Sequence, residues 1–198
     1  MAAKIGLFGY VLIAFVIIVI VKIYTESDSY NLKCIISEID GNKYCVRERD
    51  KLQLAADLLA RTTQNLKKLV LHVGAKYPDR KNCQRLIKGF NPTTVKEILP
   101  TSSYTAYSEN KGEKLAFCTT TTKEGNKLID ENTLLFVAIH ELGHIMTTSV
   151  GHTDEFWRNF KFLLMEAHKV GMYKPVDYKK EPGLYCGMDI KDNPYFDL

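Results

Sequence analysis

The sequence lacks a strong excess of charge of either sign. Its 27 basic and 23 acidic residues give a net charge of +4, and without Lys4 and Lys22 the balance is 25 basic against 23 acidic residues, or +2. A nucleic-acid-binding domain normally carries a clear excess of basic residues on one face. The near-neutral balance therefore argues against nucleic acid as a partner.

The sequence also lacks any paired-cysteine motif, internal repeat or low-complexity segment. Its five cysteines are an odd number, and no two of them have the CxxC spacing of a zinc ribbon. They are Cys34, Cys45, Cys83, Cys118 and Cys186. There is no Asn-x-Ser/Thr acceptor, because Asn91 is followed by Pro92, and this disfavours a glycosylated exterior.

One long hydrophobic run is present at the amino terminus. Residues 5–21 carry no charge and are bounded by Lys4 and Lys22, and two more apolar residues extend the run to the length of a bilayer span. We expect residues 1–24 to form a transmembrane signal anchor, with residues 5–24 in contact with the lipid bilayer. The chain is then a single-pass membrane protein.

A cleaved signal peptide is the competing interpretation of this run. The run is longer than a usual signal-peptide core, and no small-x-small cleavage pattern follows it. Both features favour an uncleaved anchor. The orientation stays open, because Lys4 on one side is nearly balanced by Lys22 and Lys33 on the other.

The most informative motif is a His-Glu-x-x-His sequence that begins at His140. Apolar residues surround it at helical spacing, and Asp130 or Asn132 is a suitable N-cap. Residues i and i+4 share one face of a helix, so His140 and His144 direct two imidazoles at one metal, with Glu141 beside its water. The alternative is that both histidines are hydrogen-bonded residues of the core. Burying two imidazoles and a nearby carboxyl group costs free energy, however, unless a metal or other polar partners compensate for the lost hydration. The motif predicts a catalytic zinc site.

The third ligand must come from outside this motif. A metzincin site requires Gly three residues and His six residues after the second His, and Thr147 and Val150 occupy those positions. That class is excluded in its usual form. A thermolysin-like site would use a Glu of the next helix, such as Glu155 or Glu166. We favour His152, which lies at the start of that helix.

The stretch from His140 to Trp157 resembles the WLM and SprT-like metalloprotease families, in which a third His and an aromatic pair follow the HExxH helix after a short loop. The resemblance implies an α+β, zincin-like domain, with a small mixed sheet packed on the HExxH helix and further helices. It implies a Zn²⁺ ion held by His140, His144 and His152. Glu141 would be the general base, and Phe156 and Trp157 would pack the second helix against the first.

The remaining chain divides into a linker with a small hairpin at residues 25–48 and one domain at residues 49–198. We expect the hairpin to turn at Asp40-Gly41, which places Ile36 opposite Cys45 and puts a Cys34–Cys45 disulfide out of register. Cys45 as a thiolate that plugs the zinc is a further possibility.

Periodicity predicts the other elements. Helices are expected at residues 50–73, ended by Gly74, and at 81–88, 92–98 and 153–170, the last with Thr153 as its N-cap and Gly171 as its end. Strands are expected at residues 103–108 and 113–121.

Two further site assignments follow from these elements. By the zincin resemblance, the second strand would present an edge that pairs with a peptide substrate, through Leu115, Phe117 and Thr119. An ordinary sheet strand without contact to substrate is the alternative. Among the tyrosines of the carboxyl-terminal tail, Tyr185 is our choice to stabilise the oxyanion. Asp154 and Glu155 are expected to be charges of a helix first turn, with orientation of a ligand imidazole as the alternative.

The sequence thus predicts a membrane-anchored zinc metallopeptidase acting on a protein or peptide. The alternatives are a catalytically silent zincin-fold module that binds or supports a partner, and a metallohydrolase acting on a non-peptide substrate.

Overall fold

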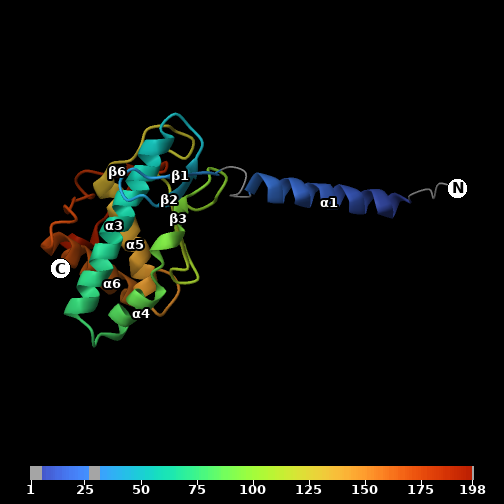
Figure 1. The fold of residues 1–198 in the computed structure, drawn as a ribbon. Helices are drawn as coiled ribbons and strands as arrows, with labels where there is room; N and C mark the ends of the chain where they lie inside the picture. The colour runs from blue at the N-terminus through green and yellow to red at the C-terminus, as the bar shows by residue number, and fades with distance from the viewer. Residues whose placement is uncertain (1–5, 27–31, 198) are drawn as a thin grey trace.

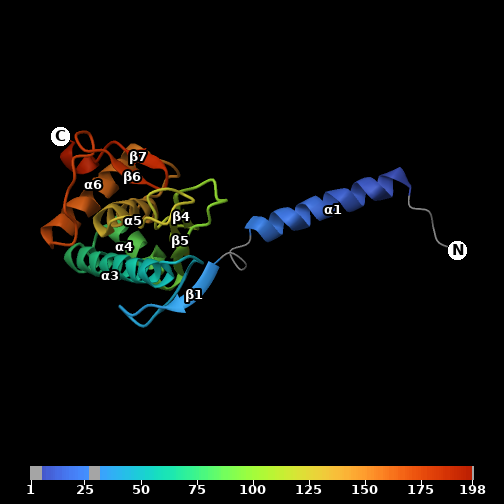
Figure 2. The same cartoon turned by 90° about the horizontal axis from the view of Figure 1, so that it is seen from above.

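The computed structural model describes residues 6–26 and 32–197 (Figure 1). Helix α1 (Leu7–Glu26) stands apart from the other elements (Figures 1 and 2). Its segment Leu7–Tyr24 is long and apolar enough to cross a membrane, and none of it is buried in the protein. A signal sequence would satisfy the same criteria.

The other elements form an α+β body around a five-stranded mixed sheet. The strand order is β1-β2-β3-β5-β4; the pairs β1/β2 and β4/β5 are antiparallel, and β2/β3 and β3/β5 are parallel. The predicted α+β class is confirmed. The strands are β1 (Leu32–Ile36), β2 (Lys43–Arg47), β3 (Val95–Glu97), β4 (Ala106–Glu109) and β5 (Lys114–Phe117).

The HExxH helix lies among the other helices and against the sheet. It contacts α3, α4 and α6 as well as β4 and β5, and Figure 2 shows it between α3 and α6. Its faces are mostly apolar and buried, so its position is set by packing on several sides. The helices are α3 (Leu52–Lys76), α4 (Lys81–Gly89), α5 (Glu131–Met146) and α6 (Asp154–Lys169), and a second antiparallel pair is formed by β6 (Gly183–Tyr185) and β7 (Met188–Ile190).

The caps predicted for the two helices of the motif region are confirmed. The side chain of Asp130 accepts a hydrogen bond from the Thr133 amide at 2.8 Å, and Thr153 accepts one from the Phe156 amide. Gly171 follows α6 with a φ of +72°, a conformation that glycine adopts without steric cost. Local sequence therefore defines the start of both helices and the end of α6.

The hairpin register predicted from the sequence is wrong. The strands pair Ile36 with Lys43, so the connection has six residues, and Cys34 lies directly opposite Cys45. The longer loop is held by Asp57 of α3, which accepts hydrogen bonds from the Ser37 hydroxyl and from the Glu38 amide. The structure joins the two cysteines in a disulfide, which excludes the proposed Cys45 thiolate ligand.

One predicted helix end and one predicted helix are also wrong. Helix α3 continues through Gly74 to Lys76. A Cβ at Gly74 would lie 2.6 Å from the Ile87 side chain of α4, so this glycine permits close helix packing and does not end the helix. Residues 92–98, predicted as a helix, form a short 3₁₀ turn followed by β3, because β3 is held in the sheet between β2 and β5.

The five cysteines provide a first prediction. Cys34–Cys45 and Cys118–Cys186 are disulfides and Cys83 is free and buried. Alkylation of the unreduced, denatured chain should therefore modify one cysteine, and alkylation after reduction should modify all five; mass spectrometry counts both. A Cys83→Ala variant should add no label without reductant. Labelling of three or more cysteines in the unreduced chain would contradict this pairing.

Candidate metal centre

Three histidines from two elements bring their Nε2 atoms together. The Nε2 atom of His140 lies 3.2 Å from that of His144 and 3.1 Å from that of His152. The metal-ligating atoms of the three residues all lie within 4.8 Å of one another. The structure therefore unites the two motif histidines of α5 with the residue just before α6 that the sequence proposed as their partner.

This arrangement fits a metal ion better than a set of hydrogen bonds. The Nε2 atom of a neutral imidazole carries either one proton or one lone pair. The Nε2 atom of His140 therefore cannot form a full hydrogen bond with both neighbouring imidazoles at once. For a tetrahedral ion with metal–nitrogen distances of 2.0–2.1 Å, neighbouring ligand nitrogens are about 3.3 Å apart. The two short Nε2–Nε2 distances are close to that value.

Burial keeps the two imidazoles of α5 neutral. It lowers the pKa of His140 to about 3 and that of His144 to about 4, and the neighbouring imidazoles act in the same direction. Both side chains therefore carry a free lone pair at neutral pH, as metal coordination requires. His152 is exposed, whereas His140 and His144 are partly buried.

Packing between α5 and α6 holds the imidazoles in place. The Phe156 ring stacks on His144 with a centroid distance of 4.3 Å and lies 4.8 Å from His140. A Cβ at Gly143 would be 3.1 Å from Phe156, so a glycine within the motif admits this ring. The expectation that Phe156 packs the second helix against the first is confirmed, whereas Trp157 is 42% exposed.

Two basic residues that the sequence analysis did not identify fix the loop between the second and third histidines. Lys111 Nζ donates hydrogen bonds to the carbonyls of His144, Thr147 and Ser149. Arg85 donates to the Met146 carbonyl and forms an ion pair with Glu155. Both residues are distant in sequence, so no local pattern indicates these roles.

The two glutamates weighed as alternative ligands have other partners. Glu155 accepts hydrogen bonds from the Thr148 amide and from Arg85, which agrees with its expected role as a first-turn charge. Glu166 is buried on α6 among His72, Lys76 and Lys169. Neither belongs to the histidine cluster, whereas His152 does.

Glu141 lies beside the cluster and is mostly buried. Its side chain is buried, and burial raises the pKa of its carboxyl group to about 7. It accepts no hydrogen bond from any residue in the described part of the chain, yet it lines the same groove as the three histidines. A carboxyl group with this pKa is suited to accept a proton at neutral pH and to return it.

The groove next to the histidines has a volume of about 840 Å³. Its floor is formed by α5, one wall by β4 and the residues before it, and the other by α6 and the carboxyl-terminal segment. All three histidines and Glu141 line it. The candidate metal centre is therefore open to a molecule larger than water.

The strand predicted to present a free edge is not an edge. Strand β5 lies between β3 and β4, and Leu115 and Phe117 are completely buried. Thr119 donates to the buried Glu97 carboxylate, so none of these three residues faces the groove. The edge strand is β4, and Ala106, Tyr107 and Ser108 line the groove. The sequence pattern identified the pair of strands but not their order.

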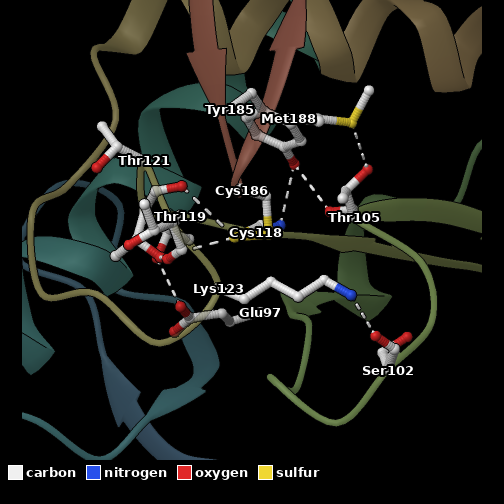
Figure 3. Close-up of a disulfide and its surroundings, with 12 residues drawn as sticks. Glu97, Ser102, Thr105, Cys118, Thr119, Thr121, Lys123, Tyr185, Cys186 and Met188 are labelled. Carbon is white, nitrogen blue, oxygen red and sulfur yellow. Dashed lines mark hydrogen bonds between the residues drawn. A yellow bond between two sulfur atoms is a disulfide. The ribbon is translucent and has the colours of Figure 1, made fainter.

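The Tyr185 hydroxyl, which the sequence predicted to stabilise the oxyanion, contacts two backbone groups. Figure 3 shows its hydroxyl between two backbone groups: it donates to the Thr105 carbonyl at 3.1 Å and accepts from the Cys118 amide at 3.0 Å. Its proton is therefore already used. The adjacent Cys186 is joined to Cys118, so the hydroxyl and the disulfide together fix the β6–β7 hairpin to the end of β5.

Comparison with known proteins finds similar viral proteins. The chain is 27% identical over 173 residues to an uncharacterised protein of Acanthamoeba polyphaga mimivirus, over 85% of this chain and 86% of that protein. It is 32% identical over 84 residues to an uncharacterised protein of Invertebrate iridescent virus 6, over 42% of this chain and 47% of that protein. An uncharacterised protein of Invertebrate iridescent virus 3 is 37% identical over 70 residues, 35% of this chain and 43% of that protein.

No family model and no solved structure matches the chain. The names of these viral relatives state no activity. The features of this chain that bear on its function are therefore the histidine cluster, Glu141 and the groove.

Proposed function

We propose that this protein is a zinc-dependent metallopeptidase attached to a membrane by α1. The observation that carries the proposal is the convergence of three histidine Nε2 atoms beside a buried carboxyl group, at the floor of a groove. Three protein ligands leave one tetrahedral position open, which is typical of catalytic zinc sites and not of structural ones. The WLM and SprT-like resemblance of the sequence around His140 agrees with this assignment.

Each residue of the site has a defined role in the proposed reaction. His140, His144 and His152 would hold the metal, and zinc would supply Lewis acidity toward a carbonyl oxygen and toward water. Glu141 accepts the proton of the attacking water and delivers it to the departing amine, so that the peptide bond is hydrolysed to a carboxylate and an amine.

The edge strand β4 supports a peptide as the substrate. One edge of β4 pairs with β5, and the other edge has no strand partner within residues 32–197. An extended peptide that pairs with this free side would lie along the groove that contains the histidines. This arrangement favours peptide hydrolysis over a reaction on a small non-peptide molecule.

The two disulfides indicate on which side of the membrane the folded body lies, a question that the distribution of basic residues leaves open. Disulfides form and persist in oxidising compartments and on virion or cell surfaces. The folded body contains both pairs, whereas α1 has no cysteine. We therefore infer that the body after α1 lies on the oxidising side of the membrane.

Metal analysis tests the site directly. The full-length protein, purified in detergent without chelators, should contain about one zinc ion per chain by mass spectrometry of the metal. A His144→Ala variant should lose most of it, because two imidazoles hold zinc much more weakly than three. His168→Ala is the matched control, since its imidazole contacts the Tyr173 carbonyl outside the cluster, and its zinc content should not change.

The possible results separate the candidate functions. Absence of zinc from the wild-type protein, or equal zinc in the His144→Ala variant, would refute the metal site. Zinc without cleavage of any peptide would favour the binding module, and cleavage of an ester or a non-peptide amide alone would favour a different hydrolase.

A further inference from the structure

The groove beside the histidine cluster is lined mainly by apolar side chains. They come from α5, from the loop before α6, from α6 and from the carboxyl-terminal segment. Several of them are exposed despite their size: Val150 is 89% exposed, Met188 47% and Trp157 42%. Exposed apolar residues that gather in one groove usually mark a binding surface. The lining includes Val137, Val150, Trp157, Met188, Ile190 and Pro194.

The charged residues of the groove already have partners. Lys111 donates to three backbone carbonyls, and Asp189 pairs with Lys191 at 3.7 Å. Asp192 pairs with Lys179 at 3.0 Å. Apart from Glu141, the described lining thus offers no unpaired charge to a ligand. A charged side chain would lose hydration in this groove without a compensating ion pair.

The two walls of the groove are connected. The Thr105 hydroxyl, at the start of the β4 wall, donates to the Met188 sulfur at 3.3 Å (Figure 3). Tyr185 and the Cys118–Cys186 disulfide fix the hairpin that carries Met188. The apolar wall is therefore held at a set distance from the edge strand, which allows it to select by side-chain size.

We propose that the substrates are extended peptide segments with a bulky apolar side chain next to the scissile bond, and that Trp157 and Ile190 contact this side chain. The inference rests on the proposed peptidase function and adds a substrate class to it. Trp157 stands next to the metal site, with its ring 5.6 Å from that of His152. Ile190 is only 9% exposed and also lines the groove. Burying one large apolar side chain favours binding about tenfold to a hundredfold.

The chain contains one tryptophan, Trp157, so its fluorescence reports directly on occupation of the groove. We would titrate the full-length Glu141→Gln protein, loaded with zinc in detergent, with three peptides. They share one sequence and differ only at the position expected beside the scissile bond, which is Leu, Ala or Asp. The Leu peptide should change the fluorescence and bind at least about tenfold more tightly than the Ala peptide, with the Asp peptide weakest.

A pair of substitutions tests the wall itself. Val150→Asp adds a negative charge to the groove at an exposed position. The variant should bind the Leu peptide more weakly than the unsubstituted groove does, and it should bind a Lys peptide more tightly. Leu71→Asp adds the same charge on α3, where Leu71 is 71% exposed and outside the groove, and should leave binding unchanged. Equal binding of the Leu, Ala and Asp peptides, or no binding at all, would overturn the proposed selectivity.

Cleavage by the wild-type protein separates this inference from the function on which it rests. Selective binding of the Leu peptide without any cleavage would overturn the peptidase assignment and retain the apolar groove. Cleavage of a mixed peptide library with no preference for Leu, Ile, Phe or Met beside the cut would retain the peptidase and overturn the selectivity.

Discussion

Replacing Glu141 with Gln is expected to lower kcat/KM for peptide cleavage by a factor of about 10² to 10⁴. The amide has nearly the same shape as the carboxyl group but does not accept the proton of the attacking water. Glu141 accepts no hydrogen bond from a described residue and its pKa is raised to about 7 by burial. A neutral side chain at this position therefore breaks no contact and should not lower stability.

The measurement is the initial rate of cleavage of a quenched fluorescent peptide by the full-length protein, together with its zinc content. The variant should retain zinc, because the three imidazoles are unchanged. Glu131→Gln is a matched control on the first turn of the same helix, where Glu131 pairs with Arg61 at the surface, and its activity should equal that of the wild type. Full activity of the Glu141→Gln protein would show that another group is the base.

Replacing Glu97 with Ala is expected to lower the free energy of unfolding by about 3–5 kcal/mol. Glu97 is completely buried at the end of β3 and accepts hydrogen bonds from the amide and side chain of Arg47 and from Thr119. Its carboxylate also pairs with Arg49 at 2.7 Å. The substitution leaves two largely buried guanidinium groups without their shared anion, and burial already lowers the pKa of Arg49.

Urea unfolding of the full-length protein, followed by Trp157 fluorescence, measures this loss. The control is Glu131→Ala, whose partner Arg61 is 38% exposed at the side chain, and whose removal should cost at most about 1 kcal/mol. Similar losses in the two variants would mean that the cluster around Glu97 contributes no more than a surface ion pair.

The candidate site was largely predictable because its signals are local. His140, Glu141 and His144 lie within five residues, so helical periodicity alone places them together. The N-caps Asp130 and Thr153 were predicted because a cap is formed by side chains and amides three residues apart. The position of His152 follows from the short loop between the two capped helices.

The long-range pairings could not be obtained in the same way. The hairpin register depends on Asp57, which holds the loop from α3, and so the Cys34–Cys45 pair was placed out of register. Likewise, β4 and not β5 is the edge strand, because β3 occupies the other side of β5. Strand pairing at large separation leaves little trace in local sequence, since any two apolar alternating segments satisfy the same pattern.

The amino-acid sequence alone was thus sufficient to identify the apolar amino-terminal segment, the helix with its two histidines and the third histidine, since each depends on residues close together in the chain. The folded structure was required to show the free edge at β4, the apolar wall opposite it and the use of the Tyr185 hydroxyl by Thr105. These features arise where segments far apart in sequence meet, and their contacts are set by the packing of the whole core.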